Sequence, residues 1–320
     1  MEQNQLFKQK RTYTRKQKRI IFYSLMFAVP LLQFLLFYIY VNFNSIILAF
    51  TSKTPKLDGI GFDVAITSEN FKRAFTFFFS DTCGKMLWNS FQLFVCQIVV
   101  VTPLALLFSY YIAKNRAGAS FFRIMLYLPQ VISVVVLGIL FKYIVNEVYP
   151  YIAEEFFDKK DVLGLMLPKS SYNAKFYSAL VFTLWFSFGT NVLIYTGAMS
   201  SVDQSVVESA QLDGVTNLQE FYYIYVPMIF STVTTFVVTG IAGIFNNQMS
   251  LHTFFNNAGY VDVLGYYFYR LTALNLENAA GGKMMNLHEL AALGLIATVI
   301  LVPITLFTRK MLNTYGPRFD

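Results

Sequence analysis

Long apolar stretches alternate along this chain with shorter segments that carry most of its charged side chains. Each uncharged stretch can supply the roughly 17–25 apolar residues that cross a bilayer as a helix. The pattern therefore predicts about six transmembrane helices. They are expected near residues 20–42, 88–113, 123–145, 176–199, 226–248 and 289–310.

Composition supports a membrane protein. Hydrophobic residues make up 56% of the chain and charged residues only 13%, whereas soluble domains carry about 25% charged residues. We predict an all-α polytopic integral membrane protein of one domain, residues 20–310. A basic tail, residues 1–19, precedes that domain, and a short tail, residues 311–320, follows it.

The distribution of basic residues predicts the orientation. Residues 1–19 hold seven Lys and Arg side chains, and more basic residues flank the loop between the second and third spans and the C-terminal end. Because basic loops stay in the cytoplasm, both termini are expected to be cytoplasmic in a bacterial plasma membrane. The first apolar run is too long for a signal peptide and is interpreted as a retained helix.

The loop at residues 200–225 departs from this rule, because it contains four acidic residues and no Lys or Arg. It is interpreted as two short helices around a turn at Gly214, a residue suited to a left-handed helix end. Ser205-x-x-Glu208 and Thr216-x-x-Gln219 are the expected capping boxes. Such a helix–turn–helix on a membrane protein is expected to fit a partner outside the bilayer.

Several activities are excluded by missing motifs. There is no G-x-x-x-x-G-K-[ST] phosphate loop, so the chain does not hydrolyse ATP in the usual way. Two isolated cysteines and two isolated histidines indicate neither a metal site nor a disulfide framework. The centres of the spans lack charged residues, which argues against an ion-driven pump. A transported solute would be neutral, with energy supplied by another protein.

The loop resembles the cytoplasmic EAA loop of permease subunits in bacterial ATP-binding-cassette importers of the maltose-type, carbohydrate-uptake class. The matching residues run Glu208-Ser209-Ala210-x-x-Asp213-Gly214-Val215, then Phe221, Ile224 and Val226-Pro227. Leu126-Tyr127-Leu128-Pro129, Phe245-Asn246-Asn247 and Glu289-Leu290-Ala291-Ala292 agree in order and spacing. Ser209 and Val215 depart from the small residues of the family pattern, and the coupling role is expected to survive both changes.

The resemblance implies a type I importer permease without cofactors of its own. The implied partners are a second permease subunit in a heterodimer, two ATPase subunits that bind ATP and Mg, an extracytoplasmic solute-binding protein and a carbohydrate. The chain contacts the lipid bilayer, and no nucleic acid is expected. The resemblance assigns ATPase coupling to Glu208, Ser209, Ala210, Asp213 and Gly214. An alternative, an interfacial helix lying on lipid, is disfavoured because the acidic loop would be repelled by anionic lipid.

A substrate pathway is predicted from uncharged polar residues in the third and fourth spans. They are Gln130, Ser133, Thr183, Ser187, Thr190 and Asn191. Their hydroxyl and amide groups suit sugar hydroxyls, but such groups also join helices to one another in membranes. Gly240 and Ile244 stand where the family has hydrogen-bonding residues, so the sugar is left open. The alternatives are a permease for another neutral solute, or a stand-alone channel or secondary carrier.

Overall fold

The computed structural model describes residues 14–55, 62–159, 162–255, 258, 260–273 and 285–317, and most of them are helical. The N-terminal part comprises α1 (Arg15–Gln33), α2 (Val41–Ala49), β1 (Thr51–Pro55), β2 (Phe62–Ile66), α3 (Glu69–Phe78), α4 (Asp81–Cys96) and α5 (Thr102–Ala113). The middle comprises α6 (Ala119–Val131), α7 (Val134–Tyr143), α8 (Tyr149–Phe157) and α9 (Tyr172–Ser200). The remainder comprises α10 (Gln204–Leu212), α11 (Asn217–Glu220), α12 (Val226–Met228), α13 (Phe230–Asn246), α14 (Leu251–Phe255), α15 (Leu264–Ala273) and α16 (Leu287–Tyr315).

Five of the described helical segments are long and apolar enough to cross a membrane, and a sixth span results if one bent pair is counted. The straight candidates are Arg15–Ala49, Asp81–Ala113, Val134–Phe157, Tyr172–Ser200 and Leu287–Tyr315. The bent pair joins Asn217–Met228 to Phe230–Phe255 at an angle of 65°. The predicted all-helical membrane fold is confirmed. A short antiparallel hairpin of β1 and β2, which pairs Thr51 with Ile66, was not predicted.

The third predicted span was wrong in its position. Residues 123–145 do not form one helix, because the chain is extended at Ile132 (ψ 143°) and Ser133 (ψ 130°) between α6 and α7. Pro129 already lies in the last turn of α6 and cannot donate a backbone hydrogen bond there. The membrane-length segment of this region is Val134–Phe157 instead.

The π-helical segments inside the long helices lie next to prolines. Three π-helical segments, Gln97–Val101, Ile144–Val148 and Phe221–Tyr225, each lie directly before a helix with proline near its first residue. Those prolines are Pro103, Pro150 and Pro227. A proline has no N–H and its ring clashes with the preceding turn. Widening that turn is one way in which a helix accommodates the change. A fourth π-helical segment, Phe34–Tyr40, follows Pro30.

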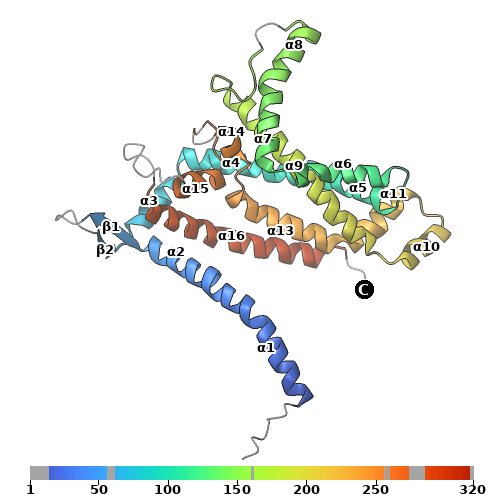
Figure 1. The fold of residues 1–320 in the computed structure, drawn as a ribbon, viewed down its shortest axis with the longest axis horizontal. Coiled ribbons are helices and arrows are strands. Elements are labelled where there is room, and N and C mark those ends of the chain that lie inside the picture. The colour runs from blue at the N-terminus through green and yellow to red at the C-terminus, as the bar shows by residue number, and fades with distance from the viewer. Residues whose placement is uncertain are drawn as a thin grey trace, which may run out of the picture.

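The spans pack into a bundle with two projecting arms (Figure 1). Helix α9 packs along α5 and α6, while α13 packs against α4 and α16. Helix α1 and the α7–α8 segment extend away from the bundle in different directions (Figure 1). The most apolar window of the first span is completely unburied. That apolar surface needs lipid or protein to cover it, since water would be an unfavourable contact.

Gly189 marks the crossing of α6 and α9. A Cβ atom there would collide with the backbone oxygen of Leu126, whereas one at Gly197 on the same helix would meet nothing within 4 Å. The absence of a side chain at Gly189 therefore lets two backbones approach closely, as small residues do in membrane bundles.

We expect Gly189→Ala to destabilise the bundle by about 1–3 kcal/mol through overpacking, and to lower the melting temperature of the detergent-purified protein. Gly197→Ala is the matched control and should leave the melting temperature unchanged or raise it, because Ala is the better helix former. Equal melting temperatures for the two variants would contradict the close approach of the α6 and α9 backbones at Gly189.

Candidate functional site

The 200–225 loop folds as a helix, a turn and a second helix. Helix α10 begins after Asp203, whose carboxylate accepts a hydrogen bond from the Ser205 backbone N–H at 2.9 Å. That hydrogen bond lowers the pKa of Asp203. The predicted Ser205–Glu208 capping box was therefore wrong, because Asp203 takes the cap two residues earlier. The Thr216–Gln219 capping box is present at the start of α11.

Gly214 forms the turn between the two helices. Its φ of +78° is left-handed, a conformation in which side-chain-bearing residues are strained. The backbone N–H of Gly214 donates to the Gln211 carbonyl at 3.1 Å, and that of Val215 donates to Ala210 at 3.2 Å. These bonds satisfy carbonyl groups at the end of α10 that the helix itself leaves open.

One apolar residue attaches α10 to the bundle. Val207 is fully buried and belongs to a hydrophobic cluster that includes Tyr195 and Met199 of α9 and Phe221 beyond α11. Its neighbour Val206 is 41% exposed. Val202, which precedes α10, packs against the same cluster, so Val202 and Val207 attach this end of the loop to the bundle.

Glu220 is the electrostatic centre of the loop. Its carboxylate is 2% exposed and lies 2.5 Å from the Lys114 ammonium at the end of α5. Tyr110 donates its hydroxyl to the same oxygen at 3.3 Å. The other carboxylate oxygen accepts a hydrogen bond from the Gln211 side chain in α10 at 3.1 Å. One buried carboxylate therefore ties α5, α10 and α11 together.

A second set of bonds strengthens this connection. The Arg116 guanidinium donates to the Asn217 side chain at 2.6 Å. The Tyr110 hydroxyl lies 3.1 Å from the Asn217 backbone oxygen, which accepts its hydrogen bond. Basic residues of the α5–α6 loop are thus bound to the acidic 200–225 loop. The loop can lack its own Lys and Arg because a neighbouring loop supplies the compensating charge.

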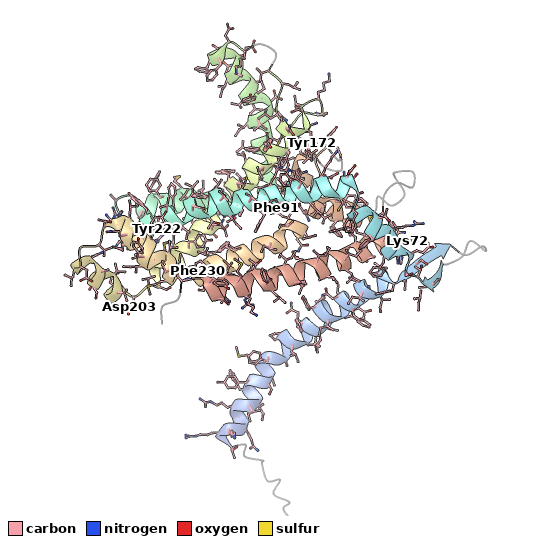
Figure 2. All side chains as sticks on the ribbon, turned by 180° about the vertical axis from the view of Figure 1, so that it is seen from behind. Lys72, Phe91, Tyr172, Asp203, Tyr222 and Phe230 are labelled. Atoms are coloured by element: carbon pink, nitrogen blue, oxygen red, sulfur yellow. The ribbon has the colours of Figure 1, made fainter. Side chains whose placement is uncertain are left out.

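The opposite side of the loop is left accessible. Glu208, Ser209, Asp213 and Gly214 are exposed, and Ala210 is half-buried. Leu212 is 89% exposed between them, and Leu218 is also strongly exposed. Asp203 and Tyr222 mark this end of the molecule in Figure 2. An exposed mixture of acidic and large apolar side chains on a braced loop is typical of a protein-binding surface.

The predicted substrate-pathway residues lie around α9, but several of their polar groups are used for packing. Gln130 donates its amide to the Phe186 carbonyl. Thr183 donates to the Ala179 carbonyl of its own helix at 2.8 Å. Ser187 lies 3.1 Å from the Gln97 side-chain oxygen and 3.0 Å from the Leu184 carbonyl. The Gln130 bond joins α9 to α6, and the Ser187–Gln97 bond joins α9 to the π-helical segment after α4, as polar groups commonly do between membrane helices.

The remaining pathway residues differ in their surroundings. Thr190 is half-buried on α9, and Ser133 is exposed at the break between α6 and α7. The side-chain nitrogen of Asn191 is buried without a hydrogen-bond partner among the described residues. Packing explains the glycine at position 240, because a Cβ there would lie 3.1 Å from the Phe94 ring. Its departure from the family pattern therefore leaves space for an aromatic side chain of α4.

Three positions of the candidate sites were missed by sequence reasoning. Glu220 and Lys114 are 106 residues apart in the chain, and no local pattern connects them. Two signals in the sequence could have suggested the pair. Lys114 ends one predicted span, and the 200–225 loop after another span is acidic without any basic residue of its own. Gln97, which meets Ser187, could have been suspected as an amide inside an apolar run.

Comparison with known families now identifies the class of protein. The family of binding-protein-dependent transport system inner membrane components matches residues 102–320. The chain belongs to this family. This permease is accordingly a non-catalytic transmembrane component of a binding-protein-dependent ABC importer.

Individual relatives resemble the permease over most of its length. It is 23% identical over 312 residues to the arabinooligosaccharides transport system permease protein AraP of Bacillus subtilis (strain 168), covering 93% of this chain and 92% of that one. It is 24% identical over 233 residues to the glucose import system permease protein GlcT of Saccharolobus solfataricus, covering 69% and 75% of the two chains.

The permease also has the fold of a solved importer chain. That chain belongs to a bacterial alginate ABC transporter in complex with a periplasmic protein that carries an alginate pentasaccharide. The two structures superpose with a TM-score of 0.70 at 20% identity, over 95% of this chain and all of the other.

We expect Glu220→Leu to destabilise the loop by about 3 kcal/mol, because it leaves the partly buried Lys114 unpaired. The melting temperature should fall, and protease cleavage within residues 200–225 should accelerate. The double variant Lys114→Met/Glu220→Leu should regain part of this loss, since replacing both partners of a buried ion pair costs less than removing one. Glu208→Ala, at an exposed glutamate of the same loop, is the stability control. A Glu220→Leu protein as stable as that control would contradict the proposed bracing.

Proposed function

We propose that this permease forms half of the translocation pathway of an ATP-driven importer for a sugar or oligosaccharide. The loop at residues 200–225 would receive the conformational change of an ATPase subunit and pass it to the spans. Two ATPase subunits would bind ATP and Mg, and a second permease would complete a heterodimeric pore. The observation that carries the proposal is the braced loop, which is exposed on one side and tied to α5 and α9 on the other.

The contacts of the loop suit a mechanical connection. Val207 contacts the C-terminal end of α9, and the Glu220–Lys114 ion pair connects to the end of α5. A force applied to α10 would therefore reach two spans through side chains with little freedom. Glu208 and Leu212 stay available on the outer side of α10 for an ATPase groove.

The proposed partners fit the remaining surfaces. Helix α1 and the α7–α8 arm expose many large apolar side chains, which lipid and a second permease would cover. The solved neighbour forms a complex with a periplasmic protein, which supports an extracytoplasmic solute-binding protein here. The C-terminal end of α16 lies at the same end of the molecule as the 200–225 loop (Figure 1). This arrangement supports cytoplasmic placement of the loop and of both termini, since basic loops favour that side.

The proposed solute class rests on two observations. The described polar groups near α9 are hydroxyls and amides, which suit sugar hydroxyls. Two of the relatives are named for arabinooligosaccharide and glucose uptake, and another is named for polygalacturonan and rhamnogalacturonan. The neighbouring structure handles an acidic polysaccharide, but the predicted pathway of this permease carries no fixed positive charge. We therefore favour a neutral saccharide.

Purification of the tagged permease from its native membrane in mild detergent, followed by mass spectrometry, tests the assembly. A stoichiometric ATPase, a second permease and a solute-binding protein should accompany it. Recovery of the chain alone or as a homo-oligomer under conditions that preserve such complexes would contradict the proposal and favour a stand-alone channel.

Glu208→Lys should abolish solute uptake, because it reverses a charge on the exposed face of α10, while the protein stays in the membrane. ATPase co-purification should fall in parallel. Glu155→Lys reverses an exposed glutamate of α8, away from the loop, and serves as the control. Full uptake by the Glu208→Lys protein would show that this face of α10 does not contact the ATPase.

Gly214→Val should also reduce uptake and ATPase association, because a side chain in the left-handed region costs about 1–2 kcal/mol. The reason is conformational, since a Cβ at Gly214 would meet nothing within 4 Å. Gly214→Asn is the matched variant, as Asn tolerates this conformation, and it should retain most activity. Equal uptake by both variants would show that the turn geometry is unimportant for coupling.

A further inference from the structure

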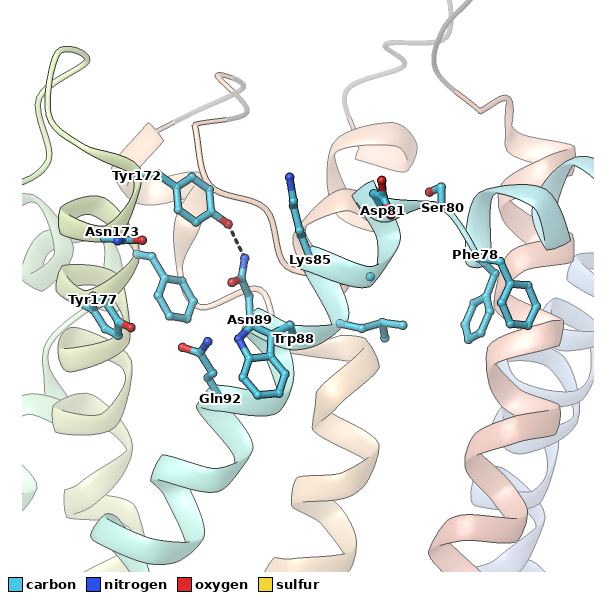
Figure 3. Close-up of a pocket in the computed structure, with 14 residues that line it drawn as sticks. Phe78, Ser80, Asp81, Lys85, Trp88, Asn89, Gln92, Tyr172, Asn173 and Tyr177 are labelled. Carbon is cyan, nitrogen blue, oxygen red and sulfur yellow. Dashed lines mark hydrogen bonds between the residues drawn. The ribbon is translucent and has the colours of Figure 1, made fainter.

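A cavity of about 900 Å³ lies between the first turns of α4 and α9 (Figure 3). Its volume is within the range of about 300–1,000 Å³ that is usual for small-molecule sites. It lies at the end of these helices that is remote from the 200–225 loop, near Tyr172 in Figure 2. None of the pathway residues predicted from the sequence lines it.

Exposed aromatic rings form much of its wall. Trp88 is 60% exposed, and Tyr172 and Tyr177 present about half of their surfaces. Phe79, near the start of α4, is also exposed to the cavity. Aromatic faces carry partial negative charge and a large apolar area. The C–H faces of a sugar ring are complementary to such surfaces.

Amide groups are placed among these rings. Asn89 is buried and donates its side-chain nitrogen to the Tyr172 hydroxyl oxygen at 2.5 Å and to the Asp262 carbonyl at 2.8 Å. These two bonds fix Asn89 and one edge of Tyr172. Gln92 extends from α4 toward Tyr177, and Asn173 lies across from it on α9 (Figure 3). Both amides can donate to and accept from hydroxyl groups.

The charges in the wall balance. Asp81 and Lys85, one turn apart on α4, are its charged residues, and they carry opposite signs. A cavity with rings, amides and no net charge matches a neutral polyhydroxylated ring better than an anion. It also suits such a ring better than a lipid tail, because burying amide groups against hydrocarbon without hydrogen bonds is unfavourable.

We propose that this cavity binds a neutral saccharide unit at the outer mouth of the permease. One sugar ring would stack on Trp88 or Tyr177, and its hydroxyls would bond Gln92 and Asn173. The proposal rests on the proposed function and adds a binding site to it. Ser187 lies ten residues further along α9 than Tyr177, about 15 Å at the helical rise. A saccharide released from the mouth would next meet the polar contact between Ser187 and Gln97.

The two tryptophans of the chain provide a direct binding assay, since they are Trp88 and Trp185. In the full chain in lipid nanodiscs, Trp185→Phe leaves Trp88 as the reporter inside the cavity. Titration with arabinotriose should change its emission saturably, whereas an alginate trisaccharide should not. Adding Gln92→Ala should weaken the apparent affinity about tenfold, as expected for one lost hydrogen bond. Trp88→Phe, which keeps Trp185, is the control and should not respond.

Any of three outcomes of this assay would overturn the proposal. One is the absence of a saturable change with arabinotriose, glucose and maltotriose. Another is strong quenching of Trp88 by brominated acyl chains, which would show that lipid occupies the cavity. An emission change that requires added second permease would likewise show a subunit interface instead of a sugar site.

Uptake by the assembled importer separates this proposal from the proposed function. Trp88→Ala should raise the KM for the transported saccharide about tenfold, because the ring on which the sugar stacks is lost, with maximal rate and ATPase co-purification unchanged. Tyr315→Ala removes an exposed ring at the C-terminal end of α16, outside the cavity, and should leave the KM unchanged. If the unaltered importer moves no saccharide, the proposed function itself is wrong. If it does, and Trp88→Ala has an unaltered KM, the cavity is not a substrate site.

Discussion

The hydrocarbon core of a bilayer offers no water to backbone groups, so the chain must satisfy them within its own helices. The rest of this structure depends on that constraint. Proline removes one donor from each helix that contains it, and the described helices respond with π-helical turns before Pro103, Pro150 and Pro227. After Pro129 the helix ends, and the chain is no longer helical at Ile132 and Ser133. Just after Pro227 the helix is interrupted, and the segments before and after the interruption meet at an angle of 65°.

The 200–225 loop lies outside this hydrocarbon environment and uses a different interaction. Its acidic side chain at Glu220 is buried and neutralised by Lys114 from another loop. A buried carboxylate is unfavourable unless it is paired and hydrogen bonded, and Glu220 has three partners that meet this need. The loop therefore has one preferred position relative to α5 and α9. This position leaves the remaining acidic and apolar groups of α10 directed away from the bundle.

Polar residues within the spans serve two purposes. Ser187 and Gln130 form hydrogen bonds to neighbouring segments and so contribute to packing, whereas Thr183 bonds to a carbonyl of its own helix. The cavity at the start of α4 and α9 differs because its amides lie among exposed rings. Packing consumes polar groups where helices touch, whereas polar groups at a helix mouth can remain available to a solute. Location relative to the neighbouring helices, more than residue type, separates the two roles.

The sequence by itself determined the membrane class, the approximate number of spans and the Gly214 turn. Each follows from short-range properties: the length of an apolar run needed to cross a bilayer, and the backbone freedom of glycine. The residues from Glu208 to Gly214 also showed the likeness to the permease family to which the chain belongs. Only the tertiary structure decided that Val207 anchors α10, that Glu220 pairs with Lys114, and that Gly189 lets α6 approach α9. These contacts join residues from different helices. Helix periodicity does not specify which faces meet, because in a lipid-covered helix both faces are apolar.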